Sequence, residues 1–214
     1  MQKKIIVGVA AVGLLTAIAS HAIAAVPGVY AGGQLGYGNI HESGFGNTDQ
    51  GLAGRVFAGY QINTNFAAEL GWARFRTADA KYNYSYTYVF NNAPITMHSN
   101  FKDTLKTNVV DLTAKGIYPV AQDFSLYGKL GGAYVIQNSK GRGVVNFGTP
   151  GSTNSNFNWD STDKALYPTA TIGGAYDLSP NLAADVFYTR IQQVGSKSIQ
   201  SIDFAGAGLA YHFS

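Results

Sequence analysis

The chain has 214 residues, and its 15 Lys and Arg against 12 Asp and Glu give a formal net charge of +3. It contains no cysteine, which excludes disulfide bonds and cysteine-ligated metals, and its length fits a single domain. Lys3 and Lys4 lie in a leader that we expect to be removed, which leaves 13 basic against 12 acidic residues. A net charge of +1 without a clustered basic face predicts no nucleic-acid partner.

The first 24 residues have the pattern of a secretory signal peptide. The two lysines precede an apolar run from Ile5 to Ala19, and the small-x-small sequence Ala22-Ile23-Ala24 provides a cleavage site. The alternative, a transmembrane helix, needs about 20 apolar residues, and neither this run nor any later segment reaches that length. We therefore predict a cleaved signal peptide over residues 1–24 and one domain over residues 25–214.

The mature chain then shows eight segments in which apolar side chains alternate with polar or small ones. A period of two residues is typical of β-strands with one apolar face. In the third segment, Leu70 and Trp72 lie on one face, and Glu69 and Gly71 lie on the other. Each segment has roughly the ten residues that a tilted strand needs to cross a bilayer. The predicted strands span residues 29–38, 52–62, 66–75, 106–118, 124–134, 165–178, 182–190 and 201–213.

The connections between these strands alternate between short and long. The short ones, rich in Asn, Pro and Ser, span residues 63–65, 119–123 and 179–181. The long polar ones span residues 39–51, 77–105, 137–164 and 191–200. Every second connection of an up-and-down barrel lies at the same rim, so the pattern predicts short periplasmic turns and long extracellular loops. The loop over residues 137–163 is rich in Asn, Ser and Gly, and we expect it to be flexible.

Alternation alone does not decide which face lies inside, because a soluble lipocalin-type barrel alternates as well. Aromatic residues gather near both ends of the strands on the apolar face, as they do at the two membrane–water interfaces. We therefore predict an all-β fold: an eight-stranded antiparallel up-and-down transmembrane β-barrel in the outer membrane of a Gram-negative bacterium. The predicted aromatic girdle consists of Tyr37, Tyr60, Phe66, Trp72, Tyr118, Phe124, Tyr134, Tyr176, Tyr188, Tyr211 and Phe213.

Several motifs make the sequence similar to the OmpA/OmpX family of small outer-membrane β-barrels. The most specific stretch is Leu112-Thr113-Ala114-Lys115-Gly116-Ile117-Tyr118-Pro119. Further matches lie at residues 29–37, 59–63, 69–72, 126–132, 173–174 and 208–213. The resemblance implies contact with outer-membrane lipid and lipopolysaccharide, and recognition by the barrel-assembly machinery through the C-terminal strand. No peptidoglycan-binding domain follows Ser214, so we expect no cell-wall tether.

The face opposite the aromatic girdle carries charges of both signs. Charges in a narrow lumen must be paired or hydrated, so we predict a salt-bridge network that fills the barrel. The alternative is a gated path for small ions, whose conductance would be low rather than porin-like because eight strands leave little space. The resemblance implies a gate role for Glu69 and Lys115, but Asp185 and Ala175 stand where the family has the other gate residues. Glu69 is then expected to pair with Arg55, Lys115 or Lys129. The predicted network consists of Arg55, Glu69, Asp111, Lys115, Lys129 and Asp185.

The long connections offer a second candidate surface. Tyr82, Tyr84, Tyr86 and Tyr88 alternate with polar residues, which suggests β-structure that extends beyond the membrane. These tyrosines either contact a host or cell-surface ligand or belong to a solvated hairpin that caps the barrel.

The sequence offers no catalytic or metal site. The mature histidines are His41, His98 and His212, and they show neither a Ser-His-Asp arrangement nor metal-ligand spacing. We predict a structural surface protein without cofactor or metal rather than an enzyme. A narrow ion pore and, less favoured, a lipid-directed enzyme are the alternatives.

Overall fold

The computed structural model describes residues 27–40, 49–76, 78–90, 93–147, 155–195, 199 and 201–213. Within these ranges no helix is long and apolar enough to cross a membrane. The predicted signal peptide lies outside them. The strands are β1 (Gly28–Ile40), β2 (Asp49–Gln61), β3 (Phe66–Phe75), β4 (Ala78–Phe90), β5 (Ala93–Pro119), β6 (Phe124–Phe147), β7 (Ser155–Ser179), β8 (Leu182–Ile191) and β9 (Ile202–Phe213).

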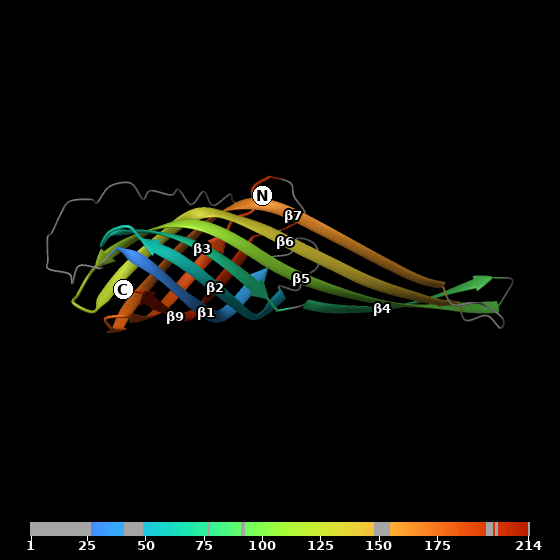
Figure 1. Cartoon of the computed structure of the whole chain (residues 1–214). Helices are drawn as coiled ribbons and strands as arrows, with labels where there is room; N and C mark the ends of the chain where they lie inside the picture. Colours follow the sequence, from blue (N-terminus) through green and yellow to red (C-terminus); the bar gives the residue numbers. More distant parts are fainter. Residues whose placement is uncertain are drawn as a thin grey trace, which may run out of the picture.

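Eight of these strands close into a ring (Figure 1). The order β3-β2-β1-β9-β8-β7-β6-β5-β4 is closed by an additional pairing between β3 and β5, which leaves β4 outside the ring. All pairings are antiparallel, and β9 pairs with β1 from Val29↔Phe213 to Ile40↔Ile202. The first and the last described strands therefore lie side by side in the wall, and no edge of the ring is left open. The predicted eight-stranded barrel is confirmed.

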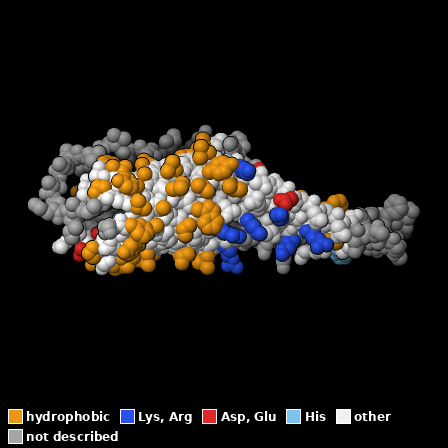
Figure 2. Space-filling model, in the orientation of Figure 1, with side chains coloured by type: hydrophobic (Ala, Val, Ile, Leu, Met, Phe, Trp, Pro, Cys, Tyr) orange, Lys and Arg blue, Asp and Glu red, His pale blue; other side chains and the backbone are white. Residues whose placement is uncertain are grey.

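The outside of this ring is apolar and the inside holds the polar groups. In β3 the exposed residues include Leu70 and Trp72, whose exposed fractions are 57% and 45%, whereas Glu69, which directly precedes Leu70, is 1% exposed. Hydrophobic side chains cover the wide part of the molecule (Figure 2). A continuous apolar exterior of this extent does not suit contact with water, but it suits contact with lipid.

Three strands of the ring, β5, β6 and β7, continue far beyond it. β5, β6 and β7 have 27, 24 and 25 residues, against 10 for β3 and for β8. Together with β4 they form a tapering sheet that extends away from the barrel (Figure 1). We call it the projecting sheet: residues 78–90, 93–105, 137–147 and 155–164.

Two predictions concern the segments that form the projecting sheet. The expectation of a flexible loop over residues 137–163 is wrong, because its described parts form the ends of β6 and β7, with Asn138 paired to Thr162. The connection over residues 77–105 contains β4 and the first half of β5, as the alternating tyrosines suggested. Neither face of this sheet belongs to the barrel wall. Its strands therefore lack the difference between an apolar and a polar face that marks a membrane-spanning strand.

The three short turns lie at the opposite rim. Side chains hold two of them, and backbone hydrogen bonds from Val120 and Ala121 to the Phe124 carbonyl oxygen close the third. The Asn63 Oδ1 atom accepts hydrogen bonds from the backbone N–H groups of Asn65 and Phe66, both at 2.9 Å. Ser179 Oγ accepts one from the N–H group of Leu182 at 3.2 Å. These contacts fix the register of the strands that carry the lumenal charges.

Candidate functional site

The lumen contains a layer of charged side chains whose positions follow from strand register. Lys115 on β5 and Lys129 on β6 are direct cross-strand partners. Two like charges in this arrangement repel each other. Glu69 on β3 is paired with Thr113, two residues from Lys115, which places its carboxylate beside both lysines. A single buried carboxylate thus holds two neighbouring ammonium groups.

Glu69 is the centre of the layer. Its carboxylate lies 2.5 Å from Lys129 Nζ and 3.5 Å from both Lys115 Nζ and an Nη atom of Arg55. It also accepts a hydrogen bond of 2.8 Å from the hydroxyl group of Tyr30. All three cations that the sequence offered as partners of Glu69 are therefore in place. This full set of partners offsets the cost of burying the charge.

Arg55 joins a second carboxylate to the layer. Its Nε and Nη2 atoms donate to the two oxygens of Asp111 at 3.0 and 2.6 Å, a bidentate pair. Its Nη1 atom donates to Oε1 of Gln34 at 3.1 Å. Two parallel hydrogen bonds fix the guanidinium plane, so Arg55 connects Glu69 and Asp111 rigidly.

Asp185 lies apart from the cations. It accepts hydrogen bonds from Gln34 Nε2 at 2.7 Å and from the Tyr127 hydroxyl group at 2.5 Å. Within the described part of the chain it forms no ion pair, so Gln34 is its link to Arg55. Tyr30, Gln34 and Tyr127 were missed as members of the network. Alternation places all three on the inner face, but the predicted network comprised ionised groups only.

Aromatic rings complete the surroundings of the two lysines. Lys115 Nζ lies 4.7 Å from the ring centre of Tyr127, and Lys129 Nζ lies 5.3 Å from that of Phe57. These cation–π contacts replace part of the hydration that the ammonium groups lose. The six predicted network residues comprise three cations and three carboxylates, so the layer is formally neutral.

The half of the lumen nearer the projecting sheet is apolar. Phe204 contacts Phe187 and Phe75 edge to face, with ring centres 4.8 and 5.7 Å apart. These rings belong to one buried cluster with Val135, Tyr167 and other residues of the inner face. This cluster was not predicted, because inward apolar residues near the strand ends resemble outward ones in the sequence. It stands between the charged layer and the outside.

Two small cavities lie in the described part of the lumen. A cavity of about 130 Å³ lies on the short-turn side of the layer and is lined by residues that include Glu69, Lys115 and His212. A second, of about 20 Å³, lies between Arg55 and Phe204. The second space is comparable to a single water molecule. The described lumen is thus filled rather than open.

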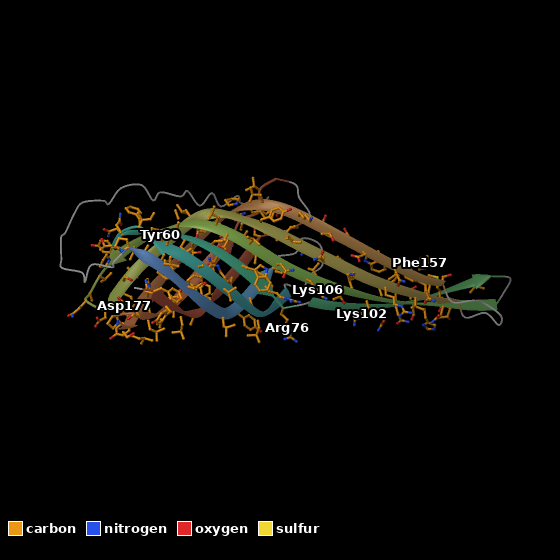
Figure 3. The ribbon with its side chains drawn as sticks, in the orientation of Figure 1. Tyr60, Arg76, Lys102, Lys106, Phe157 and Asp177 are labelled. Atoms are coloured by element: carbon orange, nitrogen blue, oxygen red, sulfur yellow. The ribbon has the colours of Figure 1, made fainter. Side chains whose placement is uncertain are left out.

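The predicted girdle residues all lie on the exterior. Their exposed fractions run from 38% for Phe124 to 62% for Tyr118. Across four adjacent strands, Trp72, Val110, Tyr134 and Leu166 occupy one continuous row. This row is the last apolar one before the projecting sheet. Tyr60 and Asp177 lie toward the short-turn end (Figure 3).

The projecting sheet presents exposed aromatic side chains on one face. Tyr84 and Tyr86 are 48% and 66% exposed. The ring of Phe101 lies 6.5 Å from that of Tyr84 and 6.3 Å from that of Trp159, so three strands contribute to one surface. We call Tyr84, Tyr86, Phe101, Phe157 and Trp159 the aromatic face. Tyr82 and Tyr88 also lie on β4, but their side chains are outside the described part.

The two described histidines, His98 and His212, do not form a recognisable catalytic group. His98 Nδ1 lies 2.9 Å from Ser85 Oγ on the exposed β4–β5 hairpin. His212 is half-buried and its ring stacks on Tyr30 with ring centres 5.0 Å apart. His41 lies outside the described residues. Within the described ones, no group of three or more His, Asp or Glu residues is arranged to hold a metal ion.

A closed antiparallel ring with an apolar exterior and paired charges inside defines the class: an outer-membrane β-barrel protein. A family model described as the OmpA-like transmembrane domain matches residues 24–214. The chain belongs to this family. It is a protein of the cell outer membrane and its surface.

Two curated relatives illustrate the relationship. The chain is 30% identical over 179 residues to outer membrane protein A of Serratia marcescens. This alignment covers 78% of the present chain and 43% of the Serratia protein. It is 27% identical over 176 residues to outer membrane protein A of Klebsiella pneumoniae, in an alignment that covers 78% of the present chain and 44% of the Klebsiella protein. The chain therefore spans less than half the length of these relatives.

Solved structures show the same fold. Ail of Yersinia pestis, determined in complex with the heparin analogue sucrose octasulfate, matches with a TM-score of 0.52 at 13% identity, over 87% of this chain and 99% of that one. The N-terminal β-barrel domain of Pseudomonas aeruginosa OprF matches with a TM-score of 0.50 at 12% identity. That match covers 87% of the present chain and 98% of the OprF domain.

Proposed function

We propose that this protein is a non-catalytic, non-conducting surface protein whose projecting sheet binds a protein partner on a host cell or a neighbouring cell. The observation that carries the proposal is the aromatic face, which stands beyond the barrel and exposes Tyr86, Phe157 and Trp159 by 66%, 54% and 39%. Exposed Tyr and Trp side chains are the residues that most often supply binding energy at protein interfaces.

The edges of the projecting sheet support a protein as the partner. β4 stands at the end of the strand order with β5 as its neighbour. Over residues 155–167, β7 pairs with β6 alone in the described part of the chain, because Pro168 accepts a hydrogen bond from Gln192 and the pairing with β8 starts at Thr169. A polypeptide strand added to such an edge gains main-chain hydrogen bonds, and the aromatic face then contacts its side chains.

Cell adherence tests the proposal. Bacteria displaying the protein are compared with bacteria displaying the triple variant Tyr84→Ser, Tyr86→Ser, Trp159→Ser. We expect the variant to adhere to epithelial cells on the order of tenfold less or weaker still, because truncated aromatic anchors each cost more than about 1 kcal/mol.

The matched control changes the opposite face of the same hairpin. Asn83→Ala, Ser85→Ala and Thr87→Ala remove exposed polar groups and should leave adherence unchanged. The gel mobility of unheated samples shows that each barrel has folded. Equal adherence of the wild type and the aromatic variant would refute the proposed role.

The filled lumen supports the non-conducting part of the proposal. An ion would have to pass both the Glu69 layer and the apolar cluster around Phe204, and moving a charge through an apolar region is costly. We expect no resolved single-channel current from the refolded protein in a planar bilayer. A steady current that changes in Glu69→Ala or Lys115→Ala would instead establish the ion-pore alternative.

We further propose that residues 1–24 are a signal peptide that is removed during export. The charged start, the apolar run and the small residues before Ala25 support this. Sequencing the N-terminus of protein extracted from outer membranes should give Ala25 as the first residue. An N-terminus at Met1 would contradict the proposal.

A further inference from the structure

The outer half of β7 is an edge of the projecting sheet. From Ser155 to Tyr167 it pairs with β6, and its pairing with β8 begins only at Thr169. The register with β6 runs without a shift, so this half is a regular strand free of bulges. Phe157 marks its outer end, far from the barrel wall (Figure 3). Among the described residues no strand covers this edge, which leaves a ladder of backbone groups for a further strand.

A hydrogen bond at the base of the edge shows which backbone groups face away from β6. The Pro168 carbonyl oxygen accepts a hydrogen bond of 3.0 Å from the N–H group of Gln192, on the β8 side. In an antiparallel strand the N–H and C=O groups of one residue point to the same side, and successive residues alternate. The even-numbered residues of β7 therefore direct their backbone groups to the open edge. These residues are Asn156, Asn158, Asp160, Thr162, Lys164 and Leu166.

The outward face beside this edge offers two unpaired cations. Lys164 stands on β7 itself, and Arg142 is the cross-strand partner of Asn158 on β6. Both are exposed, in the part of the molecule where Lys and Arg side chains gather (Figure 2). Lys140 is paired with Asp160 at 2.9 Å. Lys164 and Arg142 have no carboxylate partner among the described residues, so they attract acidic groups on an added strand.

The opposite face of the same edge is aromatic. Phe157 and Trp159 of the aromatic face stand on β7. The ring of Trp159 lies across Gly141 on β6 so closely that a Cβ atom at Gly141 would not fit. The ring therefore lies flat on the sheet, and its free side is open to a neighbouring side chain. Alternate side chains of a strand added to β7 point to this face and contact the two rings.

We propose that the open edge of β7 binds an extended peptide segment of alternating apolar and polar residues, with acidic side chains among the polar ones. The segment adds antiparallel to β7, in line with β8. Its apolar residues pack on Phe157 and Trp159, and its carboxylates lie opposite Lys164 and Asn158, the latter within reach of Arg142. The inference rests on the proposed function, and it assigns the partner's chemistry and the edge that receives it.

Fluorescence anisotropy of a labelled synthetic peptide with the folded protein in neutral detergent tests the proposal. The peptide carries valine at every second position, glutamate opposite Asn158 and Lys164, and threonine elsewhere. A second peptide carries lysine in place of glutamate. We expect the glutamate peptide to bind on the order of tenfold more tightly, because both cross-strand charge interactions reverse in sign. Equal affinity for the two peptides would overturn the proposal.

Thr162→Pro tests the edge itself. The N–H group of Thr162 faces the open edge, so proline leaves the pairing with β6 intact and removes a donor from the added strand. We expect this variant to bind the glutamate peptide on the order of tenfold less tightly. Thr162→Ala is the matched control, since it loses the same side-chain hydrogen bond to Asn138 but keeps the N–H group. Equal binding by the two variants would refute the added strand.

A charge reversal tests the specificity and does not depend on the proline variant. Lys164→Glu should weaken binding of the glutamate peptide about fivefold and strengthen binding of the lysine peptide. Arg74→Glu is the matched control, because it makes the same change of charge on β3, away from the edge. It should bind both peptides as the wild type does. An equal effect of the two reversals would show only a general charge effect and would contradict the inference.

The inference and the proposed function can fail separately. Heat-dependent gel mobility establishes folding for each variant. Thr162→Pro leaves the aromatic face intact, so normal adherence of this variant, with reduced adherence of the aromatic variant, would refute the β7 edge alone. Normal adherence of both variants would refute the proposed function. Cross-linked dimers of the protein that disappear in Thr162→Pro would show that a second copy occupies the edge, and would also overturn the inference.

Discussion

At the scale of single residues, the stability of the charged layer in the lumen depends on Glu69. Its carboxylate is almost completely buried, yet it contacts three cations and one tyrosine hydroxyl group. Each of those cations has lost most of its hydration, and Lys129 is only 4% exposed. The layer is therefore stable only as a complete set, because any member removed leaves a buried charge without its partner.

Replacing Glu69 by Gln should destabilise the barrel by about 3–5 kcal/mol, because Lys115 and Lys129 then face each other without a neutralising carboxylate. Urea unfolding of the protein in lipid vesicles measures this change. Asp160→Asn is the control, since it breaks an exposed pair and should cost no more than about 1 kcal/mol. A Glu69→Gln variant as stable as the control would show that the layer is hydrated rather than tightly paired.

Gly59 is required by the ring of Tyr30. A Cβ atom at this position would lie 2.6 Å from the Tyr30 hydroxyl oxygen, which must stay in place to donate to Glu69. We expect Gly59→Ala to destabilise the barrel by about 1–3 kcal/mol through overpacking. At Gly33 the nearest atom would be 3.9 Å away, so Gly33→Ala should be nearly neutral. Similar unfolding midpoints for the two variants would contradict the packing argument.

At the scale of strands, the sequence predicts the membrane part well and the projecting sheet poorly. β3 was predicted with the bounds that the structure gives, Phe66–Phe75, because its two faces meet lipid and lumen and differ sharply. The outer halves of β6 and β7 lie outside this contrast, and their Asn, Ser and Gly residues look like loop. The pairing of Asn138 with Thr162 is a long-range contact that no local pattern encodes.

The candidate site shows the same limit. Alternation places Glu69, Lys115 and Lys129 on one face, but only strand register shows that the two lysines are direct partners. The aromatic face combines Tyr84, Phe101 and Trp159 from three strands. Of these, Tyr84 alone belongs to a pattern that is visible along the chain.

The β4–β5 hairpin should be dispensable for barrel formation. The ring closes through β3 and β5 from Phe66↔Gly116 to Arg74↔Asn108, and β4 contributes nothing to this pairing. We therefore expect that joining Ala78 to Leu105, which are cross-strand partners, by an Asn-Gly turn leaves the barrel intact. The shortened protein should still migrate differently with and without boiling. A single unfolded band would instead make the hairpin part of the folding unit.

At the scale of the whole molecule, the bilayer is the solvent for one face of eight strands. Lipid accounts for the exposed Leu35, Leu130 and Leu166, with exposed fractions of 75%, 69% and 68%, which water would disfavour. It also explains why the described charges lie in the lumen or at the two ends of the barrel, and not among the apolar side chains of its exterior. The barrel and the lumenal layer are both consequences of this one partition.

The depth of the two tryptophans tests this partition most directly. Trp72 lies on the lipid-facing exterior and Trp159 lies on the projecting sheet, so Trp159→Phe and Trp72→Phe each leave one fluorophore. In vesicles of lipids with brominated acyl chains, the account predicts strong quenching of Trp72 and none of Trp159, with iodide in the water giving the reverse. Quenching of Trp72 by iodide but not by brominated lipid would show that water, not lipid, surrounds the barrel and would contradict the account.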